Sequence, residues 1–196
     1  MRTKIEKALP FLRCPQTHVE LTLKDSMLMG EGCEYKVSSD GIPKFAEQLC
    51  SEEGKIQEKH YDAVSDTYIK NLNYPHTREY LSYLDSVLVS AVKSNNLGVA
   101  GEICCGTGEA FNLFKGDVKF GIGVDVSMNM LRGANKNHEN EKLLFIQGDA
   151  VKLPLADAIF DNVFCLGGIH HVNNRIALFG EIERVLKPGG RFIWRE

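Results

Sequence analysis

An apolar segment that runs directly into a Gly-x-Gly turn constrains this chain more than any other feature. Residues 99–109 read Val-Ala-Gly-Glu-Ile-Cys-Cys-Gly-Thr-Gly-Glu, and a helix-forming sequence follows them. In an α/β sheet this order marks the end of a strand, a tight loop and the start of a helix. Glycines at 106 and 108 let the backbone pass close to a ligand, and the free N–H groups of the helix start face that ligand.

Two kinds of nucleotide site compete for this loop. A dinucleotide fingerprint requires a third glycine three residues after the second, and that position is Phe111, which argues against NAD. The remaining pattern, Glu-x-x-x-Gly-x-Gly, resembles motif I of the class I S-adenosylmethionine-dependent methyltransferases, which usually carry glycine where this chain has Cys104. The resemblance implies S-adenosylmethionine as the cofactor and, as its contacts here, Glu102, Cys104, Gly106, Thr107 and Gly108.

Two later strand ends follow in the order typical of this family. Residues 118–126 predict a second strand that ends at Asp125, where a carboxylate can accept hydrogen bonds from both hydroxyls of a ribose. Residues 143–150 predict a third strand, and the resemblance places Asp149 against the adenine amine; capping of a turn is the alternative for this residue. The resemblance also places an apolar side chain against adenine, and Met128 or Met130 can fill this role. A position in the core is the alternative for both. The other cofactor contacts that the resemblance implies are Val126, Met130, Ala150 and Leu166.

The segment 160–172 predicts a fourth strand whose Gly-Gly-Ile-His-His-Val end, with Asp161 at the other end, resembles motif IV of the family. His170 and His171 are the only histidines at the predicted site. One of them is the candidate general base if the acceptor is an oxygen or an acidic carbon, and a structural role for the pair is the alternative. No Lys or Arg flanks the nearby cysteines 104, 105 and 165 to activate a thiol, which indicates burial.

Residues 48–97 predict a linker followed by cap helices. The polar residues 48–58 predict a linker that leads into a helix, and this helix carries Tyr61 and Tyr68 further along. The resemblance places a tyrosine such as Tyr68 over the methionine end of the cofactor, while packing of both rings on one helix face is the alternative. Residues 77–93 carry an apolar stripe with a 3.6-residue period, which predicts a helix packed on the sheet.

Residues 1–47 predict a separate β-rich module that resembles degenerate zinc ribbons, which occur fused to some methyltransferases and as partners that activate others. The resemblance rests on residues 12–21 and 32–45, although Thr17 stands where the second cysteine belongs. A structural zinc site needs four ligands. Cys14, His18 and Cys33 offer three, and Cys50 would have to fold back as the fourth. We therefore expect no metal here, with these residues as weak candidates.

The predicted fold is α/β, a doubly wound Rossmann-like and mostly parallel sheet over residues 98–196 with strand order 3-2-1-4-5. Residues 173–187 predict a helix ended by Pro188-Gly-Gly, and the fifth strand begins at Arg191. Two further strands of the family's fold are absent from this sequence. We expect either a truncated piece or a free strand edge that pairs with a second chain, for example as a homodimer.

Composition narrows the function classes. A net charge of −3 does not favour binding to the negatively charged backbone of nucleic acid. The sequence also shows no signal-peptide core and no long apolar run. We therefore expect a cytoplasmic protein without a membrane segment. The sequence predicts methyl transfer to a small molecule. The alternatives are an RNA or protein methyltransferase that uses the N-terminal module for recognition, and a non-catalytic module that binds S-adenosylmethionine or a partner.

Overall fold

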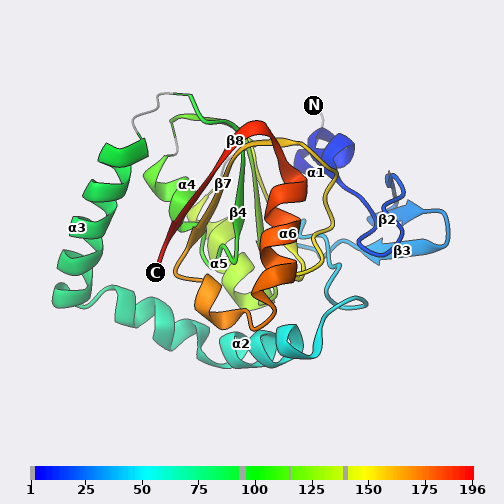
Figure 1. The fold of residues 1–196 in the computed structure, drawn as a ribbon. Helices are drawn as coiled ribbons and strands as arrows, with labels where there is room; N and C mark the ends of the chain where they lie inside the picture. The colour runs from blue at the N-terminus through cyan, green and yellow to red at the C-terminus, as the bar shows by residue number, and fades with distance from the viewer. Residues whose placement is uncertain (1–2, 93–95, 115, 139–140) are drawn as a thin grey trace.

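A five-stranded parallel sheet forms the centre of the protein (Figure 1). The computed structural model describes residues 3–92, 96–114, 116–138 and 141–196. The strands are β4 (Gly98–Ile103), β5 (Val118–Asp125), β6 (Leu143–Gln147), β7 (Phe160–Leu166) and β8 (Leu186–Arg195). They lie in the order β6-β5-β4-β7-β8, and every pair is parallel. This is the predicted order 3-2-1-4-5, which is confirmed.

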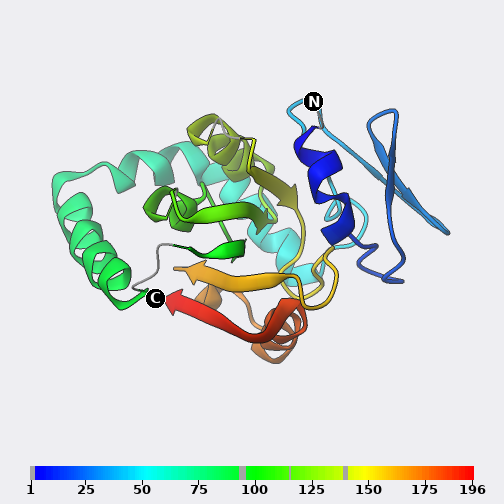
Figure 2. The ribbon, with the colours of Figure 1, turned by 90° about the horizontal axis from the view of Figure 1, so that it is seen from above.

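Each face of the sheet buries its own hydrophobic cluster, because side chains alternate between faces along a strand. In β6, Leu144 and Ile146 lie in the cluster that also holds apolar residues of α1 (Lys4–Ala8) and α6 (Arg175–Val185). Leu143 and Phe145 lie in the other cluster, with residues of α4 (Glu109–Leu113) and α5 (Met128–Asn137). The helices therefore cover both faces, as Figure 2 shows from above.

The N-terminal module is a small antiparallel sheet of β1 (Thr22–Lys24), β2 (Met27–Gly30) and β3 (Cys33–Lys36), preceded by α1 and the 3-10 helix η1 (Leu9–Phe11). It confirms the β-rich module that the sequence predicts. Its buried side chains Leu28 and Tyr35 belong to the same cluster as β4 and β5. The module therefore packs directly on one face of the large sheet instead of standing apart.

Two of the weak metal candidates come together, because the thiols of Cys14 and Cys33 lie against each other beside Tyr35. Cys14 Sγ lies 3.1 Å from the hydroxyl of Tyr35. Cys50, directly before the helix that starts at Glu52, lies beside Gly54 and Asp149 instead. Among the described residues no three His, Cys, Asp or Glu side chains are grouped closely enough to hold a metal ion. The chain leads Cys50 away to the start of the next helix, so Cys50 does not join Cys14 and Cys33, and a metal-free module stays the prediction.

Two long helices follow. The first, α2 (Glu52–Leu72), begins at its N-cap Ser51 and runs across the carboxyl ends of the strands (Figure 1). It buries only Gly54 and Ser65, so polar contacts hold it in place more than a hydrophobic stripe does. The second, α3 (Pro75–Val92), stands beside the sheet.

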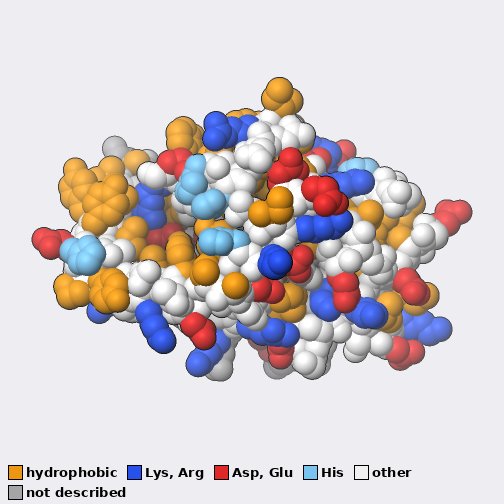
Figure 3. Space-filling view, turned by 90° about the horizontal axis from the view of Figure 1, so that it is seen from below, with side chains coloured by type: hydrophobic (Ala, Val, Ile, Leu, Met, Phe, Trp, Pro, Cys, Tyr) orange, Lys and Arg blue, Asp and Glu red, His pale blue; other side chains and the backbone are white. Residues whose placement is uncertain are grey.

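The predicted packing of residues 77–93 on the sheet is wrong for most of α3. Only Val92 is buried, whereas Tyr80, Tyr83 and Val87 are more than half exposed. Figure 3 shows hydrophobic side chains gathered at the left, on the side of the molecule where Figure 1 places α3. The helix reaches the core only at its C-terminal end, because α4 already covers the neighbouring part of this face. Residue 93, where the predicted helix ends, lies outside the described residues.

The junction between α6 and β8 also differs from the prediction. The helix ends at Val185, and β8 already begins at Leu186. Pro188-Gly-Gly therefore lies inside the first part of β8, where the pairing with β7 shifts register between Phe160 and Asn162. Gly189 has a φ of 79°, a conformation that glycine adopts without strain. At this end of the sheet, the described residues provide no strand on the outer side of β8.

None of the helices that the structure describes is both long enough and apolar enough to cross a membrane.

Candidate active site

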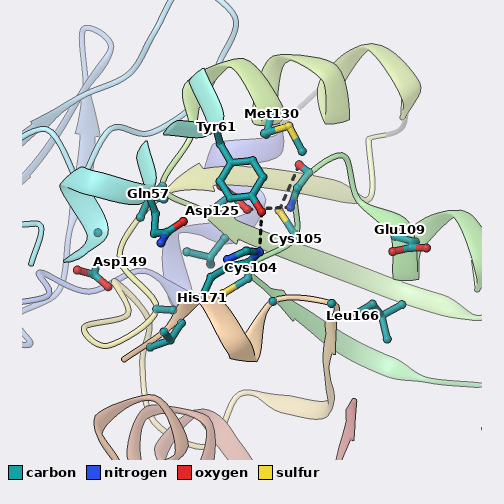
Figure 4. A pocket seen from close by; sticks show the side chains of 18 of the residues that line it. Gln57, Tyr61, Cys104, Cys105, Glu109, Asp125, Met130, Asp149, Leu166 and His171 are labelled. Carbon is teal, nitrogen blue, oxygen red and sulfur yellow. Dashed lines mark hydrogen bonds between the residues drawn. The ribbon is translucent and has the colours of Figure 1, made fainter. Parts of the chain in front are cut away.

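A cavity of about 370 Å³ opens at the carboxyl ends of the strands, under the cap helix α2 (Figure 4). Ligands of open α/β sheets bind at this end, near the switch in strand order. Most of the predicted site residues line the cavity: Tyr68, Cys104, Gly106, Thr107, Asp125, Val126, Met130, Asp149, Ala150, Leu166 and His171. Three predicted residues do not, namely Glu102, Gly108 and His170.

The loop after β4 forms the floor of the cavity. Cys104 and Gly106 both have positive φ angles, 54° and 50°. A glycine is the usual residue for such a backbone, which explains why the family carries one where this chain has Cys104. A Cβ at Gly106 would lie 3.2 Å from the terminal methyl of Met130. The absence of a side chain at position 106 therefore keeps the space beside Met130 open.

Asp125, at the end of β5, fixes this loop. One of its oxygens accepts a hydrogen bond from the backbone N–H of Gly106 at 2.8 Å, and the other accepts from Ser127 N at 2.9 Å. Burial raises the pKa of Asp125. Each carboxylate oxygen can accept a second hydrogen bond, so the side chain can hold the loop and still bind hydroxyl groups in the cavity.

Asp149 holds the start of the cap helix. Its carboxylate accepts hydrogen bonds from Ser51 N at 2.7 Å and Val151 N at 3.0 Å. The contact with Val151 is the turn-capping role that the sequence left as an alternative for Asp149. The side chain also lines the cavity, and its oxygens retain acceptor capacity for an amine.

The structure separates the two methionines of α5. Met130 lines the cavity, whereas Met128 lies in the hydrophobic cluster formed with α4. Since one turn of a helix contains 3.6 residues, two residues that are two positions apart point in different directions. Met130 is therefore the methionine that can contact a bound ligand.

Glu102 and Gly108 lie behind the loop. Glu102 is 1% exposed, and its Oε1 accepts a hydrogen bond from Ala110 N at 2.8 Å. Burial raises the pKa of Glu102 well above its usual value. Gly108, with a φ of 81°, is the N-cap residue of α4. Neither is among the residues that line the cavity, and both shape the loop, so their direct contact with the cofactor stays a prediction.

The two adjacent histidines differ in environment. They belong to η2 (Ile169–His171), which follows β7. His170 is not among the residues that line the cavity; its side chain is about half exposed and pairs with the carboxylate of Glu196. His171 lines the cavity, and its Nε2 lies 2.6 Å from the hydroxyl of Tyr61. Of the two general-base candidates, only His171 is placed to meet a substrate.

The two cysteines of the loop, Cys104 and Cys105, are not activated thiols. A hydrogen bond with Cys165 and burial raise the pKa of Cys104 well above its usual value, and burial does the same for Cys105. Both thiols therefore stay protonated near neutral pH. This agrees with the expectation from sequence that they are buried thiols and not nucleophiles.

Several residues of the site carried no sequence signal. Asp62 of α2 accepts hydrogen bonds from Ser127 Oγ at 2.5 Å and Asn129 N at 3.1 Å, which fastens the cap helix to the start of α5. Arg195 at the end of β8 forms ion pairs with Asp85 of α3 and, at 2.7 Å, with Glu109 of α4. Each of these contacts joins segments far apart in sequence, so no local spacing could have revealed it.

The cavity is lined by acidic side chains. They are Glu53, Asp85, Glu109, Asp125 and Asp149, and no lysine or arginine lines the cavity in the described part of the chain. Arg195 offsets the charge of Asp85 and Glu109 from behind the wall. The remaining field favours a cation over an anion.

Comparison with known proteins shows what the part of the chain that carries the cavity is similar to. Residues 101–194 match the family model described as a methyltransferase domain. Among curated proteins, the demethylmenaquinone methyltransferase of Staphylococcus saprophyticus is 38% identical over 99 residues, which cover 48% of this chain and 42% of that protein. This chain therefore matches less than half the length of such relatives.

Solved structures share the fold. The PH0226 protein from Pyrococcus horikoshii is 33% identical, with a TM-score of 0.54 and coverage of 63% of this chain and 56% of that one. The YcgJ protein from Bacillus subtilis is 28% identical, with a TM-score of 0.53 and coverage of 58% and 50%. The matched family model, the order of the strands and the Gly-x-Gly loop beside Asp125 lead to one assignment. Residues 101–194, just under half of this chain, match a methyltransferase domain and have the fold of the class I S-adenosylmethionine-dependent methyltransferases.

Proposed function

We propose that this protein uses S-adenosylmethionine to methylate a small molecule that carries no negative charge. The charge of the cavity carries this proposal, since five carboxylates line it and no lysine or arginine does within the described residues. Like charges repel strongly where the effective dielectric constant is low. A cofactor with a sulfonium and a neutral or cationic acceptor suit this field, and an acceptor with a phosphate or carboxylate does not.

The residues around Gly106 fit such a cofactor. The cradle beside Met130 would be narrowed by a Cβ at position 106, Asp125 can accept hydrogen bonds from a ribose, and Asp149 can accept one from an adenine amine. When bound, S-adenosylmethionine supplies an electrophilic methyl group. The chain's own part is to hold the acceptor in line with that group, which can contribute several orders of magnitude in rate.

The size of the cavity supports a small acceptor. Its volume of about 370 Å³ lies within the range of small-molecule sites, and residues of α2 line one side of it. The relative from Staphylococcus saprophyticus is named for methylation of demethylmenaquinone, which is a small molecule. An RNA acceptor is disfavoured, because its phosphates would be repelled by the carboxylates that line the cavity. A protein acceptor or a non-catalytic binding role are the remaining alternatives.

Calorimetric titration with S-adenosylhomocysteine tests the cofactor site, with NAD as the control ligand. We expect micromolar binding of S-adenosylhomocysteine alone. Tight binding of NAD, or no binding of either ligand, would contradict the proposal. Binding without turnover of any acceptor would favour the non-catalytic alternative.

Two further proposals concern self-association of the protein and its location in the cell. We keep pairing with a second copy along β8 as a proposal, supported by its free outer edge among the described residues and by the 57% exposure of Trp194. Light scattering tests it, and a monomer at high concentration would contradict it. A cytoplasmic location also stays a prediction.

A further inference from the structure

A hydroxyl and an imidazole meet inside the cavity. Tyr61 Oη, from the cap helix α2, lies 2.6 Å from Nε2 of His171, which follows β7. Both side chains line the cavity, and Figure 4 shows the tyrosine pointing from the cap helix toward the histidine. The family motifs that the sequence displays do not include this contact.

The ring of Tyr61 is held on two sides. It makes edge-on contacts with His171, at a centroid distance of 5.3 Å, and with Tyr68, at 5.9 Å. Aromatic pairs prefer such edge-to-face geometry. The hydroxyl therefore has a defined position in the cavity, as a group that handles a proton requires.

Both members of the pair are neutral near pH 7. Burial raises the pKa of Tyr61 to about 12. Burial and the neighbouring His170 lower the pKa of His171. A neutral imidazole nitrogen has one lone pair. When the hydroxyl of Tyr61 donates to Nε2, that lone pair is taken, and the phenolic oxygen becomes the open acceptor of the pair.

We propose that Tyr61 is a catalytic residue that accepts the proton of an acceptor hydroxyl while passing its own proton to His171 Nε2. This inference rests on the proposed methyl transfer and narrows the acceptor to a neutral molecule with a weakly acidic hydroxyl, such as a phenol. The acceptor O–H bond breaks and an O–CH₃ bond forms. The S–CH₃ bond breaks, and its electron pair stays on sulfur.

The charge of the cavity is conserved in this step. The sulfonium loses one positive charge, and His171 gains one as it becomes an imidazolium. The groups that face His171 are His170 and Glu196 on one side and His60 and Tyr61 of α2 on the other. Among them Glu196 favours the charged imidazole, which stabilises the product of the proton transfer.

The first test needs no turnover. The pKa of His171 is measured by NMR in the wild type and in Tyr61→Phe, with the His171→Gln spectrum assigning the resonance and Tyr83→Phe on the exposed face of α3 as the matched control. A donor to Nε2 stabilises the neutral ring, so we expect the pKa of His171 to rise in Tyr61→Phe and to stay unchanged in the control. A fall, or no change, would overturn the relay.

The second test measures rates on 1,4-naphthohydroquinone as a hydroxyl-bearing probe, by release of S-adenosylhomocysteine. General acid–base groups contribute about 10²–10⁴-fold, so we expect Tyr61→Phe to lower kcat by about tenfold or more with little change in KM. The double variant with His171→Gln should be no slower than His171→Gln alone, because both residues serve one proton path. Additive losses, or an unchanged kcat, would refute the relay.

Calorimetry separates this inference from the proposed function. If the wild type does not bind S-adenosylhomocysteine, the proposed function fails, and the NMR titration still reports on the pair. If the wild type and Tyr61→Phe both bind it but the wild type leaves the probe unmethylated, the hydroxyl acceptor is wrong while the cofactor site stands.

Discussion

The carboxylate of Asp125 accepts a hydrogen bond from the backbone N–H of Gly106 at 2.8 Å. The contact joins the end of β5 to the loop after β4, 19 residues earlier in the chain. It makes the acidic residue and the glycine loop one unit, because a change at either one alters the shape of the cavity floor.

Replacement of Asp125 by asparagine should weaken S-adenosylhomocysteine binding by about tenfold to a hundredfold. Hydrogen bonds to a charged group contribute roughly 1.5–3 kcal/mol, and the amide also loses one of the acceptors that hold Gly106 and Ser127. Calorimetry measures the effect, with Glu183→Gln on the exposed side of α6 as the control. Equal affinity in Asp125→Asn and the wild type would show that this side chain does not contact the cofactor.

Replacement of Asp62 by alanine should loosen the cap helix. The side chain of Asp62 accepts hydrogen bonds from Ser127 Oγ and Asn129 N at the start of α5, and loss of such a capping group costs about 1–2 kcal/mol. Because α2 buries few residues, we expect faster amide hydrogen exchange within 52–72 but little change in the core strands.

The matched control for this variant is Asp66→Ala, an exposed position one turn further along the same helix. Equal exchange rates in the two variants would show that the Asp62 contacts do not hold the cap helix.

Replacement of Glu102 by glutamine should flatten the dependence of stability on pH. Burial raises the pKa of Glu102 in the folded state, so the native protein binds a proton that the unfolded chain releases above its ordinary pKa. Stability from this group is therefore present at low pH and is lost as the pH rises above about 4.3. Denaturant unfolding between pH 4 and 8 measures the effect, and an unchanged slope in Glu102→Gln would contradict the assignment.

Activity should rise with pH as His171 loses its proton. Its pKa is lowered by burial and by His170, so the rise should be centred below the usual value of about 6.5. The profile of kcat/KM for the free enzyme measures it. His171→Gln should remove this acidic limb and leave a low rate. A limb that persists in the variant would assign it to another group.

The same shift has a consequence for stability. A histidine with a lowered pKa binds fewer protons in the folded state than in the unfolded chain, so stability falls as the pH drops below about 6.5. The His171→Gln variant should lose less stability than the wild type between pH 7 and 5. Parallel curves for the two proteins would mean that His171 is not desolvated under the cap helix.

Much of the fold could be predicted from the sequence because its signals are local. The apolar segments before Gly106 and Asp125 are the ends of β4 and β5, and their spacing is that of a strand-loop-helix unit. The family resemblance then predicted the order of the five strands. Crossovers between parallel strands are nearly always right-handed, which leaves few other orders. The packing of α3 could not be predicted, because an apolar stripe shows which side of a helix is apolar but not whether another element covers that side.

The sequence by itself determined the class of fold, the loop at Gly106 and the acidic residues that end β5 and β6, since each depends on neighbours within a few residues. Only the tertiary structure decided that Met130 and not Met128 reaches the cavity, that Glu102 lies behind the loop, and that His171 meets Tyr61 110 residues away. Such choices depend on how separate helices and strands pack, and the direction of a side chain is fixed only when those elements meet.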